Sequence, residues 1–163
     1  MKSYLLTEEV TKQAVSLAKV VFLEAAVRHV VRLPSIHVVI MDPVKTPECG
    51  FALGTVLYEE SIGNPSKDCV AFARSKAEIS WRHKMYSQVV QQIYPHLYEK
   101  GMTIWGGGVY LHGIAAGASG VQYQMDQWFA EMVIVTCRAL CIGQMRRIVT
   151  DVGVNYIGDK ILG

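Results

Sequence analysis

Apolar residues in the first third of the chain recur with the period of an α-helix and then with that of β-strands. Thr7 is a typical N-cap residue, and the apolar face that follows it continues until Leu33-Pro34, where the proline favours a break. This face consists of Val10, Ala14, Leu17, Ala18, Val21 and Ala25. Residues 35–41 and 51–58 are rich in β-branched or apolar side chains, which predicts two strands that pair as a long-looped hairpin.

The second half of the chain repeats this alternation. Residues 67–85 have helical period, and a short helix is predicted over about 87–99, bent near Pro95. Two short apolar strands follow, joined by a turn at His112-Gly113, and a last helix is predicted over about 121–142. The predicted order is helix, two strands, two helices, two strands, helix. Strand pairs separated in this way favour the α+β class, with helices packed against an antiparallel sheet.

Three consecutive glycines, Gly106, Gly107 and Gly108, lie in the third predicted strand. Glycine weakens an ordinary strand because it costs backbone entropy and offers no side chain for packing. A bare backbone therefore indicates one of three features: a bulge, a close crossing of two chain segments, or a ligand lying against exposed peptide groups.

The last helix is preceded by Ser119-Gly120. Ser119 and Gln122 have the spacing of a capping box, and the free N–H groups of such a helix start can also hold an anion. Residues 117–120 lack the second spacer of the G-x-S-x-G elbow, so Ser119 is not predicted to be a hydrolase nucleophile. Asp126 lies in the first turns of this helix, where an acid either complements the helix dipole or takes part in chemistry.

These motifs together resemble the GlcG/HbpS family and the C-terminal domain of PduO. The matching segments are Trp105-Gly106-Gly107-Gly108-Val109-Tyr110, Gly117-Ala118-Ser119-Gly120, Asp126 and Ser75-Lys76-Ala77. The resemblance covers about residues 5–142 and implies a profilin-like antiparallel sheet within a single domain, 1–163, whose C-terminal extension is 143–163. It also implies a small-molecule ligand, haem or another tetrapyrrole, and assembly into dimers or larger homo-oligomers.

The chain departs from the family pattern at three places. Tyr110 stands where the family commonly has proline, and Asp42 is followed by a longer stretch, residues 43–50, in place of a tight hairpin. The turn between the two glycine-bearing strands is shortened to His112-Gly113. These three changes lie at the rim of the expected site, so we expect a pocket that differs from that of the family and binds a specialised ligand.

The candidate ligand-binding residues lie around the glycine run. They are Gly106, Gly107, Gly108, Tyr110, Trp105, Ser119 and Gly120, together with Lys76 or Arg74. A lysine or arginine there would bind a carboxylate or a propionate, although charged side chains on a helix are more often simply solvated.

The candidate catalytic residues are Asp126 and His112. A histidine beside the glycine strand is an acid/base group, an iron ligand or a turn residue without a role. The chain is therefore either a binding protein for haem or another small molecule, or a cofactor-independent enzyme. The enzyme would be of the isomerase or lyase type and would act on a small carboxylated or aromatic substrate. Glycine N–H groups would hold an anion while Asp126 or His112 moves a proton.

Composition narrows the class of protein. With 163 residues, 51% hydrophobic and 18% charged, the chain can bury the core of one domain. A net charge of +2 and no basic run longer than Arg146-Arg147 argue against nucleic-acid binding. Glu8 and Glu9 interrupt the first apolar residues, and the chain lacks a run of 18 uncharged apolar residues, so we expect a cytoplasmic protein without a membrane span.

The four cysteines form no C-x-x-C pair. Cys137 and Cys141 share one helix face, but a second pair nearby is lacking, so free thiols are favoured over a metal site. The predicted last helix is apolar on nearly every face, and one sheet can cover only one side of a helix. We therefore expect a second subunit to cover the rest.

Overall fold

The computed structural model describes residues 3–150, 153 and 157, and these form an α+β fold. Its elements follow in the predicted order. They are α1 (Glu8–Val27), β1 (Ile36–Met41), β2 (Val56–Ile62), α2 (Lys67–His83), α3 (Ser87–Ile93), β3 (Gly108–Leu111), β4 (Ile114–Ser119) and α4 (Tyr123–Thr150). Every strand pairing among the described residues is antiparallel, and the strand order is β2-β1-β4-β3.

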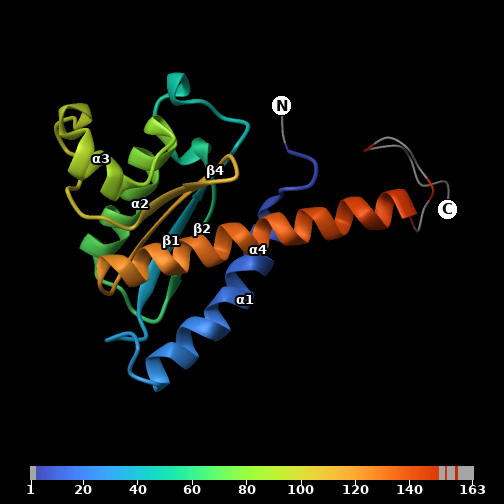
Figure 1. The fold of residues 1–163 in the computed structure, drawn as a ribbon, viewed down its shortest axis with the longest axis horizontal. Coiled ribbons are helices and arrows are strands. Elements are labelled where there is room, and N and C mark those ends of the chain that lie inside the picture. Colours follow the sequence, from blue (N-terminus) through green and yellow to red (C-terminus); the bar gives the residue numbers. More distant parts are fainter. Residues whose placement is uncertain (1–2, 151–152, 154–156, 158–163) are drawn as a thin grey trace.

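Helices cover both faces of the sheet (Figure 1). On one face α1 and α4 pack over an apolar core, in which the rings of Phe22 and Phe129 meet edge to face at a centroid distance of 5.2 Å. On the other face α2 lies across β1, β3 and β4 and buries a smaller cluster that includes Ala73, Ala77 and Trp81. The central strand β1 is buried along its whole length.

Helix α1 begins as predicted and ends earlier. The Thr7 hydroxyl accepts a hydrogen bond from the Val10 N–H at 3.3 Å, which confirms the N-cap. The helix stops at Val27, before Leu33-Pro34, because His29 takes the left-handed conformation, with φ of 59°. That conformation cannot continue a right-handed helix.

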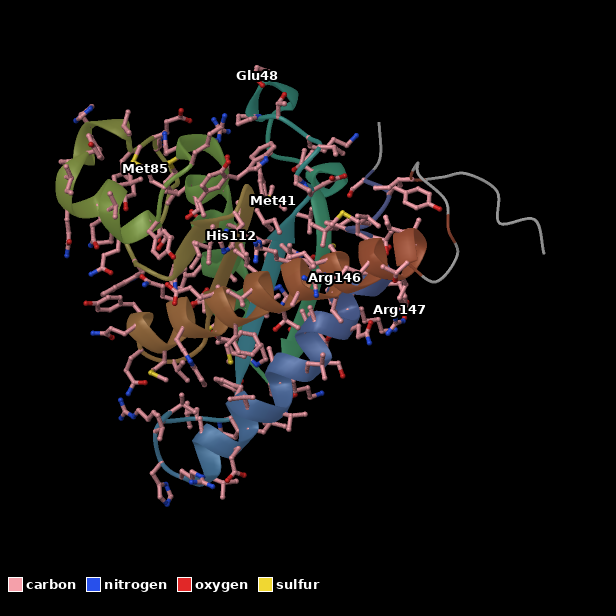
Figure 2. All side chains as sticks on the ribbon, turned by 45° about the vertical axis from the view of Figure 1, so that its right-hand side comes forward. Met41, Glu48, Met85, His112, Arg146 and Arg147 are labelled. Carbon is pink, nitrogen blue, oxygen red and sulfur yellow. The ribbon has the colours of Figure 1, made fainter. Side chains whose placement is uncertain are left out.

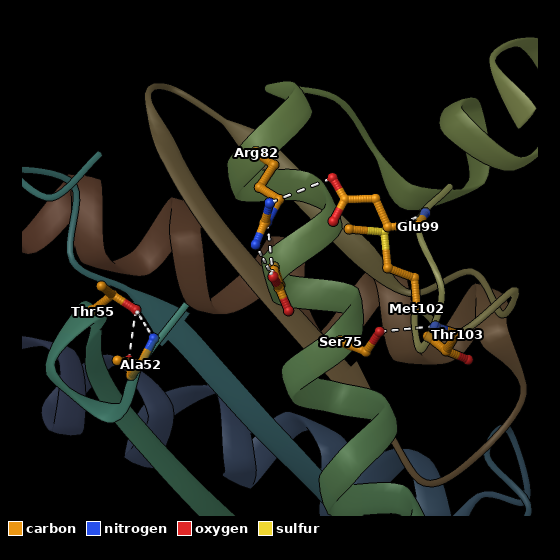
Figure 3. Close-up of polar contacts among 8 residues, drawn as sticks. Ala52, Thr55, Ser75, Arg82, Glu99, Met102 and Thr103 are labelled. Atoms are coloured by element: carbon orange, nitrogen blue, oxygen red, sulfur yellow. Dashed lines mark hydrogen bonds and ion pairs between the residues drawn. The ribbon is translucent and has the colours of Figure 1, made fainter. Parts of the chain in front are cut away.

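The second strand lies further along the chain than predicted. β2 pairs with β1 from Ile36 opposite Ile62 to Met41 opposite Val56, so the long-looped hairpin is confirmed. The apolar residues before Val56 form a turn instead. The Thr55 hydroxyl donates to the Ala52 carbonyl at 2.7 Å and accepts from the Ala52 N–H at 3.3 Å (Figure 3). Hydrogen bonds between a side chain and nearby backbone outweigh strand propensity here.

Helix α4 continues to Thr150, past the predicted end at 142. Gly143 lies inside the helix, so the first part of the expected extension is helical. Val152, Val154 and Tyr156 of that extension lie outside the described residues. In Figure 1 the helix runs well beyond the sheet, and Arg146 and Arg147 lie toward its far end (Figure 2).

By length and composition alone, α4 is apolar enough to cross a membrane. Its side chains at Phe129, Val133 and Ile134 are instead fully buried in the core that α4 shares with α1 and the sheet. A buried core helix can satisfy the same criterion, but only 28% of this apolar window is buried, so packing on this side accounts for part of the apolar composition of α4.

Candidate functional site

The glycines of β3 and β4 allow α2 to rest directly on the sheet backbone. A Cβ atom at Gly108 would clash with the Lys76 carbonyl group, and one at Gly117 would clash with the backbone of Ala73 and Ala77. Of the three alternatives for the glycine run, a close crossing of two chain segments is the correct one at Gly108.

Gly107 serves a different purpose. Its φ of 120° is a conformation that L side chains rarely adopt, and an added Cβ would lie 3.0 Å from the Asp126 Cβ and 3.1 Å from the Lys76 Nζ. Its carbonyl accepts a hydrogen bond from the Ala118 N–H at 3.1 Å. The bare backbone of Gly107 therefore lies against the side chains of Lys76 and Asp126.

The segment that leads into the glycine run is held by two serine side chains. The Ser75 hydroxyl on α2 accepts from the Thr103 N–H at 2.9 Å (Figure 3). The Ser87 hydroxyl at the start of α3 accepts from the Gly108 N–H at 2.9 Å. These two hydrogen bonds take the place of the backbone hydrogen bonds that a neighbouring strand would supply. They anchor the chain on both sides of Trp105.

Lys76 and Asp126 form a buried ion pair between α2 and α4. The Lys76 Nζ donates to Asp126 Oδ2 and to the Ala118 carbonyl, each at 3.0 Å, and both side chains are only 2% exposed. The other carboxylate oxygen, Oδ1, accepts from the Val121 N–H at 3.0 Å. The pair thus joins two helices across the end of β4 and also holds the backbone that starts α4.

Burial shifts both members of this pair toward their neutral forms. It raises the pKa of Asp126 and lowers the pKa of Lys76, because a charge is less stable away from water. The charge of each partner and the hydrogen bonds between them oppose these shifts. The charges are therefore retained only because each has the other.

A cavity of about 470 Å³ opens above the ion pair. Three aromatic side chains form its rim: Phe72, Trp105 and Tyr123, which are 38%, 56% and 36% exposed. Lys76, Asp126 and Ser119 are buried lining residues at its base. The site therefore combines an exposed aromatic rim with a buried polar floor.

The structure brings together most of the residues predicted from the sequence. Lys76, Trp105, Ser119, Gly120 and Asp126 all line the cavity. Gly106 and Gly107 lie next to it, since an added Cβ at Gly106 would contact the Tyr123 ring at 3.0 Å. Ser119 is the last residue of β4 and does not cap the helix, which begins only at Tyr123, so the capping-box prediction is wrong.

Arg74 lies outside this cavity. Its guanidinium forms a two-pronged ion pair with Glu59 on β2, with N···O distances of 2.9 and 2.7 Å. Between the two cations proposed for the cleft, the structure thus places Lys76 there and directs Arg74 to the sheet edge.

His112 and Tyr110 lie away from Asp126. His112, labelled in Figure 2, and Gly113 form the turn of the β3–β4 hairpin, with φ of 52° and 80°. This turn precedes Ile114, the first residue of β4, whereas Ser119 is the last residue of that strand. Positive φ at both positions is typical of a two-residue hairpin turn. Tyr110 lines a separate cavity. The structure therefore does not bring the two proposed catalytic residues together.

Cys69 and Phe72 of α2 are among the lining residues that were not predicted from the sequence. They precede Lys76 by seven and four positions, so all three share one face of α2. Helical periodicity counted back from Lys76 would have identified them.

No family model matches the chain, and no curated protein is significantly similar to it. Two solved structures are similar in fold. Protein ORFY of Klebsiella pneumoniae, from the family DUF336, has a TM-score of 0.56 at 17% identity, over 79% of this chain and 88% of that one. The PduOC:heme complex has a TM-score of 0.51 at 21% identity, over 77% of this chain and 91% of that one. The resemblance that the glycine, serine and aspartate motifs indicated is thereby confirmed for the fold, which is the GlcG-like fold of these two proteins.

Proposed function

We propose that the chain is a small-molecule binding protein whose ligand lies in the cavity above Lys76 and Asp126. The observation that carries this proposal is the exposed aromatic rim of Phe72, Trp105 and Tyr123 over a buried polar floor. Ligand pockets typically combine apolar walls with a few fixed polar groups, and clustered exposed aromatic groups are usually covered by a partner.

The lining residues favour a flat ligand with an apolar body. Three rings surround the opening, whereas the one cation of the floor, Lys76, is already neutralised by Asp126. An ammonium paired in this way offers little attraction to a ligand's negative charge. Charged groups of the ligand would therefore remain at the mouth, near the exposed amides of Gln122 and Gln124.

The geometry favours binding over the alternative of a proton-transfer enzyme. Each carboxylate oxygen of Asp126 already accepts a hydrogen bond from the protein. A general base must instead reach a proton of the substrate within hydrogen-bonding distance. His112, the other candidate, lies at the far end of the hairpin and does not line this cavity.

Haem is the first ligand to test, because one structure of the same fold is a heme complex. Its planar body suits the aromatic rim, and its propionates would face solvent. Cys69 and Tyr123 are the described lining residues whose side-chain types ligate haem iron, and Cys69 is the one of the two outside the aromatic rim. If haem binds here, Cys69 would hold the iron, while Phe72, Trp105 and Tyr123 would surround the macrocycle.

Titration of the purified protein with haemin tests this proposal. We expect a saturable, shifted Soret band, which Cys69→Ser moves and Trp105→Ala weakens by about tenfold, the loss expected for a large aromatic contact. Cys141→Ser on α4 and Ile104→Ala beside Trp105 are matched controls that should change neither property. An unchanged free-haemin spectrum would exclude haem as the ligand.

The wider proposal of a small-molecule site has its own test. Ligand-observed NMR with uncharged planar aromatic compounds should detect binding that is lost in Trp105→Ala and retained in Ile104→Ala. If no compound distinguishes these two variants, the cavity is not a binding site for flat ligands.

We also propose that the chain forms homo-oligomers through α1. This helix exposes apolar side chains beside its buried face: Leu17, Val20, Val21 and Val27 are 51%, 67%, 49% and 73% exposed, so Leu17 and Val21 of the predicted apolar face are only partly covered. A surface of this kind commonly marks a protein interface. Sedimentation should show a dimer or larger species that Val20→Lys dissociates and Lys12→Gln, on the same helix, leaves intact; a monomeric wild-type protein would exclude the proposal.

A further inference from the structure

The three places where the sequence departs from the family pattern meet at a second cavity. This cavity has a volume of about 410 Å³ and lies at the end of α2 opposite to Cys69 and Phe72. Its walls come from the long β1–β2 loop, with Lys45 and Glu48, and from Tyr110 and Gly113 of the β3–β4 hairpin. Figure 2 shows Glu48 on the loop. Segments that are far apart in sequence therefore build one site.

The floor of the second cavity is apolar and includes aromatic rings. Trp81 is 5% exposed and Ala115 is 2% exposed, and both belong to the cluster buried between α2 and the sheet. Tyr110 packs against this cluster and also lines the cavity. A proline at position 110 would not place a phenol ring there. The floor is therefore suited to an aromatic or other planar group.

Positive charge predominates around the opening. Lys45, Arg82 and Lys84 line the cavity, and Glu48 is the one acid among the described lining residues. Arg82 is engaged by two carboxylates outside the cavity, Glu78 at 2.7 Å and Glu99 at 3.7 Å (Figure 3). Within the described part of the chain, neither lysine forms an ion pair with a side chain.

The backbone holds Lys84 in this position. Lys84 ends α2 in the left-handed conformation, with φ of 53°, which turns the chain sharply at the cavity wall. Lysine is uncommon at such a position, where glycine or asparagine avoids the steric cost. Lys45 and Lys84 thus line the cavity together with one carboxylate, Glu48.

We propose that this second cavity binds a small organic anion, namely a carboxylate or phosphate attached to a flat apolar group. Lys45 and Lys84 would hold the anionic group at the mouth, and Trp81 and Tyr110 would contact the planar body. This site is separate from the one beside Lys76 and Asp126, since Trp105, Phe72 and Tyr123 line only the first cavity. The inference therefore does not depend on the function proposed above.

Phenyl phosphate and benzoate are suitable probes, with inorganic phosphate and benzyl alcohol as the two halves of the ligand. Calorimetric titration of the full chain should show saturable binding of at least one aryl anion in the millimolar range or tighter, and weaker binding of both halves. Changing Lys45→Gln and Lys84→Gln together should weaken it by about tenfold or more, because two charge contacts are lost.

Two matched variants make the result decisive. Lys100→Gln removes an exposed positive charge elsewhere and should have little effect, and Trp105→Ala alters only the first cavity. The proposal is overturned if no aryl anion binds, if inorganic phosphate binds as tightly as phenyl phosphate, or if Lys100→Gln weakens binding as much as the double variant. Loss of binding in Trp105→Ala would likewise overturn it, because the probe would then occupy the first cavity.

Discussion

The two faces of the sheet are covered by helices in different ways. Against α1 and α4, the sheet presents large apolar side chains such as Val38, Ile40 and Val109, which interlock with Phe22 and Phe129. Against α2 the strand β1 presents Val39 and Met41, but β3 and β4 present Gly108, Ala115 and Gly117. At the two glycines backbone lies on backbone, and a buried ion pair closes one end. Buried apolar area stabilises both faces, whereas close backbone contact and a buried ion pair are features of the α2 face.

This difference explains why both cavities lie along α2. A layer of large side chains fills the space between helix and sheet, and the α1/α4 face is packed in this manner. The middle of α2, at Ala73, Lys76 and Ala77, rests directly on Gly108 and Gly117 and leaves no space there. Each end therefore borders a hollow, one beside Cys69 and Phe72 and the other beside Trp81 and Lys84.

The largest expected effect is from breaking the ion pair on the α2 face. Asp126→Ala leaves the Lys76 ammonium buried without its opposite charge, with only the Ala118 carbonyl as a partner, which should lower the free energy of unfolding by about 3–5 kcal/mol. Urea-induced unfolding measures this loss. The double variant Lys76→Met/Asp126→Leu removes both charges and should restore most of the stability, because apolar side chains of similar volume replace the pair. If the double variant is as unstable as the single one, the charges themselves are required.

Adding a methyl group where α2 contacts the sheet backbone should lower the stability of the protein. Gly117→Ala forces a Cβ atom into the backbone of Ala73 and Ala77, and the resulting strain should cost about 1–3 kcal/mol. Gly143→Ala is the matched control, since its Cβ would meet nothing within 4 Å inside α4, and it should gain about 0.5–1 kcal/mol. Thermal unfolding of both variants is sufficient; equal melting temperatures would show that α2 can shift away from the sheet.

Removing a methyl group tests the apolar face. Ile134 is fully buried in the core between α1, α4 and the sheet, and Ile134→Val should lower the free energy of unfolding by about 0.5–1.5 kcal/mol. Val135→Ala, at a position 50% exposed on the same helix, should stay within about 0.5 kcal/mol of wild type. A larger loss at Val135 would mean that a partner subunit covers that side of α4 under the conditions of the measurement.

The order of elements could be predicted from the sequence because periodicity and caps are local features. Thr7 starts α1 by bonding to Val10, three residues away, and the β3–β4 turn is defined by His112 and Gly113 alone. The first and last residues of the elements were predicted less accurately from the sequence. β4 continues through Ser119, because its ladder with β1 includes a pair with His37, and this pairing outweighs the capping signal of Ser119.

Part of the candidate site could be predicted because its motifs are also local features of the sequence. Motifs placed Lys76, Trp105 and Asp126 in one cleft, but the ion pair between Lys76 and Asp126 spans fifty positions and depends on how α2 crosses β4. His112 was predicted to lie near Asp126 because the two residues are close in sequence. The strand β4 separates them, since His112 precedes its first residue and Asp126 follows its last. No local pattern of residues contains that information.

A partly exposed polar cluster on the sheet edge gives the smallest expected effect. On the α2 side of the paired strands β1 and β2, the two ring nitrogens of His37 lie 2.8 Å from the Ser61 hydroxyl and 3.3 Å from Glu59, which Arg74 also binds. Burial lowers the pKa of His37, although Glu59 opposes this shift. The hydrogen bond from Arg74 lowers the pKa of Glu59. Both shifts make the folded state resist protonation.

Stability should therefore fall as the pH is lowered through this range. Below pH 6.5, the ordinary pKa of histidine, the unfolded chain takes up a proton that folded His37 does not bind, and below pH 4.5, the ordinary pKa of glutamate, the same holds for Glu59. A pKa difference of one between the two states is worth about 1.4 kcal/mol. Urea unfolding at several pH values should show that the free energy of unfolding falls less steeply with decreasing pH in His37→Gln than in wild type. His83→Gln should remove a separate part of this pH dependence, because burial also lowers the pKa of His83. If the free energy of unfolding depends on pH in His37→Gln as it does in wild type, the folded protein binds a proton at His37 as readily as the unfolded chain. The polar cluster at the sheet edge would then make no pH-dependent contribution to the stability of the α2 face.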